Sequence, residues 1–230
     1  MSGGRGWRAP TAAAPVRARV SVPTAPATDA PDVAVAAAFA AAGLITGGTV
    51  LIRNWPDRSS AAETVAGAFA DMGGYVVSSA AGLTVTGRST SGAVGAVDLG
   101  VCDDAIAQIL IAVAALADGP SRIVVDDAAS GAVVADNLRR LGGRVDTDES
   151  GCLTVYPGEL TAGKWESAGR ADVALAGAVL GLVVDGLEVT DWQMVDSRYR
   201  GFTGEWTRML AADEYLVPGS DRLPHEYLER

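Results

Sequence analysis

The chain has 230 residues, of which 49% are hydrophobic and 20% are charged, so it can bury a sizeable core and is not a disordered protein. Acidic residues (28) outnumber basic ones (18) and give a formal net charge of -10 at pH 7. This charge repels phosphate backbones, so we expect no nucleic-acid partner.

The apolar stretches of the chain are shorter than the roughly 18–20 residues of a membrane helix, so we expect no membrane span. The N-terminal segment has no apolar signal region, and the chain has only two cysteines, which together favour a cytoplasmic protein. A single histidine, His225, excludes a Ser-His-Asp triad in the core. No zinc-ligand cluster, dinucleotide fingerprint or P-loop is visible, so we expect no metal and no cofactor.

In chain order, residues 1–15 are expected to form a disordered N-terminal segment. A single folded domain is expected over residues 16–215. Residues 216–230 are expected to form a polar C-terminal tail.

Three alanine-rich runs within that domain predict helices. They are Asp32 to Ile45, Asp104 to Ala117 and Asp172 to Val184. Each opens with aspartate, which is favourable at the start of a helix. Each is apolar nearly all round, so we expect all three helices to be buried on every side.

The segments that follow these runs also resemble one another. Each run is followed by a glycine turn, a strand and an amphipathic helix, and the first two of these helices end in Gly-Gly and lead into hairpins. The period of about 70 residues predicts three units within one domain rather than a solenoid. The expected fold class is α/β, as one inside-out domain with buried central helices and outer sheets.

Two long motifs resemble a known family. "PDVAVAAAFAAAGLITGGTV" is similar to P-D-x-S-S-A-x-x-x-L-A-A-A-x-I-x-G-G, and "VDLGVCDDAIAQILIAVAALADGPSRI" is similar to V-D-M-N-x-I-P-D-A-x-M-x-L-A-V-x-A-x-F-A-x-G-x-T-x-I. These are motifs of the enolpyruvyl transferases, chiefly the 5-enolpyruvylshikimate-3-phosphate synthases. The family resemblance implies two inside-out domains of three units each, with the active site in the cleft between them.

The chain resembles one half of such an enzyme. "VRARVSVPT" is similar to the family's opening strand, whose loop reads V-P-G-x-K-S, and the chain then passes almost directly to "PDVAVAA". In the family the other half is inserted at this point. We therefore expect a single domain that lacks the inserted second one.

The resemblance also implies functional residues. Asp98 falls on the family's catalytic aspartate, the base that contacts the shikimate ring hydroxyl, and Asp104 falls on the helix-opening aspartate. K-E-S/T-D-R becomes "DDAAS", in which Asp127 can replace the acid, and D-H-R becomes "RAD", which begins with Arg170. The late K-T-F-P lysine becomes Ser197.

Most cationic positions that would hold phosphoenolpyruvate are therefore absent, because a bound carboxylate and phosphate need several fixed cations. Arg170 and two arginines of the "DSRYRGF" loop, Arg198 and Arg200 on either side of Tyr199, are the candidates for binding an anionic substrate. Trp192 is a candidate aromatic platform for a planar ligand.

Structural interpretations compete with several of these roles, and for Arg198 and Arg200 the alternative is a solvated loop, whereas capping does not readily explain Asp98. Asp104 and Asp127 occupy positions where aspartate caps a helix. Trp192 ends a strand and can serve packing alone. Cys102 lies near a helix start, where a thiol can be activated, but its acidic neighbours and the lack of a histidine favour a buried filler.

Three functional hypotheses follow. The first is a diverged, single-domain enzyme of specialised small-molecule metabolism that performs acid–base chemistry, such as elimination, proton transfer or cyclisation, with Asp98 as base and Asp127 as auxiliary. The second is half of a carboxyvinyl transferase, completed by a partner protein or by a homodimer that covers the open face. The third is a non-catalytic binding or scaffold protein.

Overall fold

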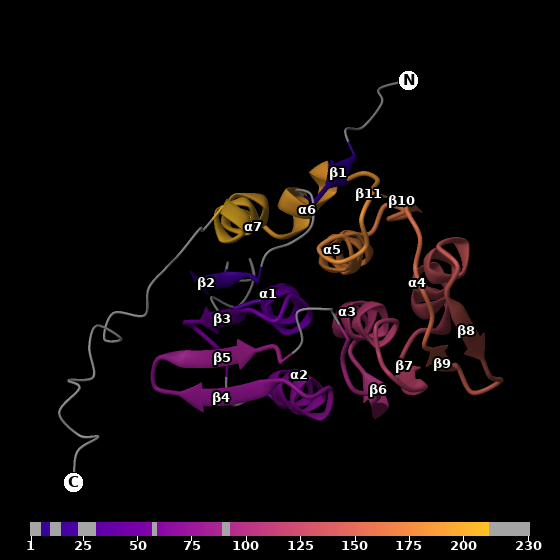
Figure 1. Ribbon diagram of the computed structural model, residues 1–230, viewed down its shortest axis with the longest axis horizontal. Helices are drawn as coiled ribbons and strands as arrows, with labels where there is room; N and C mark the ends of the chain where they lie inside the picture. Colours follow the sequence, from indigo (N-terminus) through magenta and orange to yellow (C-terminus); the bar gives the residue numbers. More distant parts are fainter. Residues whose placement is uncertain (1–5, 10–14, 23–30, 57–58, 89–92, 212–230) are drawn as a thin grey trace, which may run out of the picture.

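The computed structural model describes residues 6–9, 15–22, 31–56, 59–88 and 93–211. Three helices occupy its centre and the sheets lie outside them (Figure 1). The central helices are α1 (Val33–Ile45), α3 (Asp104–Ala114) and α5 (Ala171–Leu180). This arrangement confirms the predicted inside-out α/β fold.

The central helices are buried almost throughout. Every residue of α1 from Ala34 to Ile45 is buried, as is every residue of α3 from Ile106 to Ala114. Alanine dominates α1, and its small side chain lets helix backbones approach closely. Two of the predicted C-terminal ends were too long, because apolar residues continue beyond Ala114 and Leu180 into turns that lead to the next strands.

Two four-stranded sheets have the same plan. One contains β2 (Arg17–Val20), β3 (Thr49–Ile52), β5 (Gly82–Thr86) and β4 (Tyr75–Ser79) in that order. The other contains β6 (Asp98–Cys102), β7 (Ser121–Val125), β9 (Cys152–Tyr156) and β8 (Arg144–Thr147) in that order. In each sheet the first two strands pair in parallel and the other pairings are antiparallel. That the two sheets arise from an internal sequence repeat stays a prediction.

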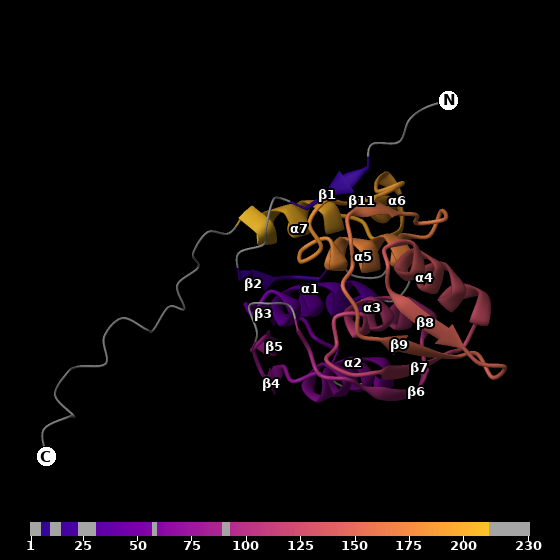
Figure 2. The ribbon, with the colours of Figure 1, turned by 45° about the vertical axis from the view of Figure 1, so that its right-hand side comes forward.

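Outer helices accompany these sheets. Helix α2 (Ser60–Asp71) packs against α1 and β4, and α4 (Ala128–Arg140) packs against α3 and β8. The side view in Figure 2 shows α4 beside β8 and α2 beside β4. Both helices bury one side only, as the amphipathic patterns predicted.

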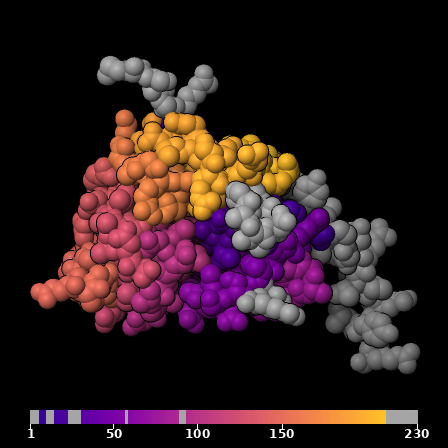
Figure 3. Space-filling view, turned by 180° about the vertical axis from the view of Figure 1, so that it is seen from behind, coloured from indigo at the N-terminus to yellow at the C-terminus, as the bar shows by residue number. Residues whose placement is uncertain are grey.

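The third unit differs from the other two. Its sheet contains β1 (Trp7–Arg8), β11 (Leu187–Val189) and β10 (Gly163–Trp165) in that order, followed along the chain by α6 (Gln193–Arg198) and α7 (Phe202–Ala211). Helix α7 contacts β2, and the space-filling view shows the C-terminal part of the chain against its N-terminal part (Figure 3). The segment Asp196 to Phe202, expected as a loop, is helical at both ends.

Strand β1 corrects the expectation that residues 1–15 are disordered. Trp7 stacks on Trp192 with ring centroids 5.0 Å apart, and Arg8 forms an ion pair with Glu188. These contacts hold a strand that pairs antiparallel with β11. The remaining residues of the predicted N-terminal segment, apart from 6–9 and 15, lie outside the described residues, as do the predicted tail 216–230 and His225.

Within the part of the chain that the structure describes, no helix combines the length and the apolar character needed to cross a bilayer.

Candidate functional site

The first residues of the three central helices gather at one end of the molecule. Asp32 caps α1 by accepting the backbone N–H groups of Ala34 and Val35 at 3.0 and 3.3 Å. Asp103 caps α3, and Arg170 is the N-cap residue of α5. Aspartate is favourable at the start of a helix, which explains Asp32 and Asp103. The positive guanidinium of Arg170 is unfavourable there, because the helix dipole is positive at the same end.

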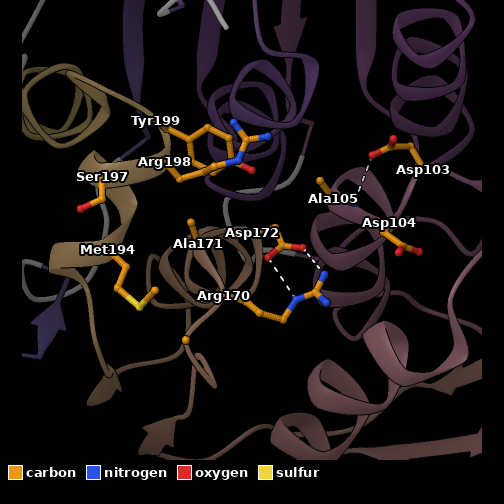
Figure 4. Close-up of a pocket in the computed structure, with 11 residues that line it drawn as sticks. Asp103, Asp104, Ala105, Arg170, Ala171, Asp172, Met194, Ser197, Arg198 and Tyr199 are labelled. Atoms are coloured by element: carbon orange, nitrogen blue, oxygen red, sulfur yellow. Dashed lines mark hydrogen bonds and ion pairs between the residues drawn. The ribbon is translucent and has the colours of Figure 1, made fainter. Parts of the chain in front are cut away.

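A pocket of about 510 Å³ opens beside the starts of α3 and α5 and reaches α6 (Figure 4). Its size suits a small molecule. The lining residues come from these three elements and the loop before α5: Asp103, Asp104, Ala105, Gly169, Arg170, Ala171, Asp172, Met194, Ser197, Arg198 and Tyr199.

The α3 side of the pocket carries two carboxylates. Asp103 accepts the Ala105 backbone N–H at 3.0 Å and is exposed. Asp104 is half-buried, and its Oδ1 accepts the backbone N–H of Asp127 at 3.1 Å. This bond joins the start of α3 to the start of α4. One turn further along α3, Gln108 donates to Ser130 at 3.1 Å and continues the same junction.

The start of α5 carries an internal ion pair. The Arg170 guanidinium donates from Nη2 to Asp172 Oδ2 at 2.6 Å and from Nε to Oδ1 at 3.3 Å. These hydrogen bonds to Asp172 raise the pKa of Arg170 above its ordinary value. The two charges offset each other, so this pair gives the pocket little net charge.

The α6 side of the pocket carries an arginine and a tyrosine. Arg198 is exposed and its guanidinium lies 5.1 Å from the centre of the Tyr199 ring. Tyr199 is only 5% exposed. Burial raises the pKa of its phenol, and the nearby charges of Asp32 and Asp172 raise it further. The hydroxyl therefore stays protonated and can donate a hydrogen bond.

Comparison with known proteins identifies the family of this chain. The family model of EPSP synthase (3-phosphoshikimate 1-carboxyvinyltransferase) matches residues 23–206. The chain belongs to the EPSP synthase family. This confirms the family that the sequence motifs indicated.

Two solved structures of the family are similar to the chain. EPSP synthase from Acinetobacter baumannii gives a TM-score of 0.61 at 17% sequence identity, covering 78% of this chain and 46% of that one. The enolpyruvyl transferase NikO from Streptomyces tendae gives 0.59 at 17% identity, covering 78% and 43%. The chain thus spans less than half the length of each, and at this identity the likeness shows the fold alone.

Three residues that the sequence analysis selected line the pocket: Asp104, Arg170 and Arg198. Asp127 lies next to them through its backbone N–H, while its carboxylate accepts the N–H of Ala129 at 3.1 Å and caps α4. Capping therefore explains Asp127 without a catalytic role.

The other selected residues do not line this pocket. Asp98 is exposed at the start of β6, opposite Arg122 of β7. Three residues of β6, with an irregularity between Leu99 and Val101, separate it from Cys102, which precedes the start of α3. Trp192 is 9% exposed and packs on Trp7 and Phe202, so packing explains its position. Arg200 is exposed in the turn after α6.

Asp172 and Tyr199 also line the pocket, although sequence reasoning named Asp172 only as a helix-opening residue and Tyr199 only as the residue between Arg198 and Arg200. The sequence could have indicated Asp172 as a site residue, because it replaces the arginine of the family's D-H-R triplet at the start of a buried helix. Nothing in the local sequence around Tyr199 indicates that its side chain is buried.

Two further features bear on earlier expectations. Cys102 is a free, buried thiol whose pKa is raised by burial and then by Asp103. A raised pKa makes the thiol a poor nucleophile. In the described ranges, no group of three or more His, Cys, Asp or Glu side chains is placed to hold a metal ion.

Proposed function

We propose that this chain is a diverged member of the EPSP synthase family that binds a small, anionic substrate in the pocket at the starts of α3 and α5 and performs acid–base chemistry on it. The observation that carries the proposal is that one pocket holds both a half-buried carboxylate, Asp104, and an arginine, Arg198, on different elements.

Asp104 is the base in this proposal. Within the described ranges only its Oδ1 has a hydrogen-bond partner, the backbone N–H of Asp127. That bond fixes the side chain and leaves Oδ2 to take a proton from a carbon or hydroxyl of the substrate. Asp104 is the first residue of α3, so its carboxylate lies at the start of that helix and faces the pocket.

Arg198 binds the acidic group of the substrate. It has no ion pair with a carboxylate of the described residues. Arg170 is less suited to this role because both of its hydrogen bonds to Asp172 would have to rearrange. Negative charge that develops when Asp104 removes a proton is stabilised by the Arg198 guanidinium.

Ligand-observed NMR tests this proposal. The full chain is screened with a panel of small carboxylates and phosphates, and each hit is repeated with Arg198→Gln and with the control Arg17→Gln. Arg17 is an exposed residue of β2 outside the pocket. We expect hits that weaken about tenfold in Arg198→Gln only, a free-energy change of about 1.4 kcal/mol. Hits whose affinity is unchanged in Arg198→Gln, or a panel without any hit, would overturn the proposal.

A second candidate is half of a carboxyvinyl transferase, completed by a partner protein or a second copy. It is favoured by the coverage of 46% and 43% of the two solved relatives. Phosphate release from phosphoenolpyruvate with shikimate 3-phosphate tests it, with the chain alone and over a range of concentrations. Release whose specific rate rises with chain concentration would support a site completed by dimerisation. No release is expected from a single-domain enzyme of different chemistry.

A further inference from the structure

The pocket separates its charges between two sides. Figure 4 shows Asp103 and Asp104 on the α3 side and Arg198 with Tyr199 on the α6 side, with the Arg170–Asp172 pair between them. Because that pair is internally neutralised, the charges left for a ligand are two carboxylates on one side and one guanidinium on the other. A purely anionic ligand meets repulsion at the α3 side.

The charge around Tyr199 shows the same excess of acid. Burial is the largest cause of its raised pKa, and the charges of Asp32, Asp172 and Asp103 add to it, while Arg198 acts in the opposite direction. Carboxylates thus dominate the surroundings of the Tyr199 phenol, although the positive ends of helices point here. A ligand with a cationic group is favoured by this balance.

Tyr199 supplies a further polar group to the pocket. The residue is 5% exposed and lines the pocket, and its hydroxyl points from the α6 side toward Asp103 and Ala105 (Figure 4). Among the side chains that the structure describes, none forms a hydrogen bond with this hydroxyl. This hydroxyl is therefore available to hydrogen-bond a polar group of a bound ligand.

We infer that the pocket binds a zwitterionic small molecule of the amino-acid type. Its ammonium group lies against Asp104 and Asp103 and its acidic group lies against Arg198, while the Tyr199 hydroxyl can hydrogen-bond a polar group of the ligand. This inference rests on the proposed function, since it names the class of substrate for the same pocket, and it adds the requirement for an amine.

Three probes that differ only in charged groups test the inference: L-phenylalanine, 3-phenylpropionate and 2-phenylethylamine. Binding to the full chain is followed by chemical-shift changes of backbone amides at the pocket. We expect L-phenylalanine to bind with a Kd at least tenfold below that of either relative that lacks one charge. Equal or tighter binding of 3-phenylpropionate would overturn the inference.

Variants assign each charged group to its partner. Asp104→Asn should weaken L-phenylalanine about tenfold and leave 3-phenylpropionate equally or more tightly bound, whereas Arg198→Gln should weaken both. Asp71→Asn on α2 and Arg17→Gln on β2 are exposed controls that should change neither. Equal binding of L-phenylalanine by Asp104→Asn and the unmodified chain would also overturn the inference.

The outcomes separate this inference from the proposed function. Binding of 3-phenylpropionate that depends on Arg198, with no gain from the amine, would overturn the zwitterion and leave the anionic site standing. No shift of any pocket amide with any of the three probes would count against both.

Discussion

The two ends of the central helices differ in charge. Their starts carry Asp32, Asp103, Asp104, Arg170 and Asp172, whereas the last turns of α1, α3 and α5 contain no basic residue. A dipole argument alone would place cations at the C-terminal ends and none at the start of α5. The aspartates suit the helix starts and only Arg170 does not, so helix stability leaves one charge unexplained, and we propose that this end of the molecule serves binding while the rest serves packing.

The middle of α1 should respond to substitution through stability alone. Phe39 is fully buried, 5.2 Å from Phe202 and 5.5 Å from Trp206 between ring centroids. Phe39→Ala should lower the free energy of unfolding by about 3–5 kcal/mol, because it removes an aromatic ring from a packed core. Urea denaturation measures this change. The control is Tyr75→Ala on β4, where the side chain is exposed and a change within about 0.5 kcal/mol is expected. Equal effects of the two variants would contradict the packing account.

The pocket end should respond through activity. Once a substrate is found, Asp104→Asn should lower the rate by about 10²–10⁴, because the amide keeps the shape and the hydrogen bond from Asp127 but removes the base. Asp98→Asn is the comparison, since Asp98 was selected from the sequence and lies outside the pocket. Melting temperatures of both variants should match that of the parent. Lost activity in Asp98→Asn with full activity in Asp104→Asn would move the base to β6.

Two helical glycines sharpen the packing side of the comparison. A Cβ added at Gly177 of α5 would lie 2.4 Å from Cδ1 of the buried Trp165, whose ring N–H is fixed by a 2.7 Å bond to the Val173 carbonyl. Gly177→Ala should therefore destabilise the protein by about 1–3 kcal/mol. Gly67 of α2 has no atom within 4 Å of such a Cβ, so Gly67→Ala should stabilise it by about 0.5–1 kcal/mol. Thermal unfolding that ranks the two variants in the reverse order would contradict this account.

The smallest effect is expected at Tyr199. Tyr199→Phe removes a hydroxyl that has no partner in the described part of the chain, so stability near neutral pH should change little. Burial raises the pKa of this phenol, so above pH 10 or so the unfolded chain releases a proton that the folded chain keeps. The parent protein should therefore lose stability with rising pH in that range relative to Tyr199→Phe. Parallel pH profiles in denaturant unfolding would show that the phenol is not perturbed.

Local sequence predicted the core of this fold well. The runs around Phe39, Ile109 and Leu175 are apolar on every side, and only a helix enclosed by other elements satisfies such a pattern. Motif spacing also brought Asp104 and Arg170 to the pocket, because both positions belong to helix starts that the family motif fixes.

Long-range contacts account for what the sequence did not indicate. Trp192 resembled a possible ligand platform until Trp7, from the other end of the chain, was found stacked on it. Asp98 retains the family spacing to Asp104, but strand β6 separates the two residues, and Asp98 pairs with Arg122 of β7 at the far end of that strand. Helix α6 has only six residues, fewer than two turns, which is too little signal to separate it from a loop.

Strand β1 also sets the order in which the molecule can be completed during synthesis. Arg8 pairs with Glu188, 180 residues further along the chain. At roughly 5–20 residues per second, a ribosome needs on the order of 10–40 s to add that interval. For most of this time Trp7 is without its stacking partner, while the two four-stranded sheets can already assemble. The third sheet is therefore the last to close, and Trp7 is an exposed apolar side chain that chaperones can bind until Trp192 emerges.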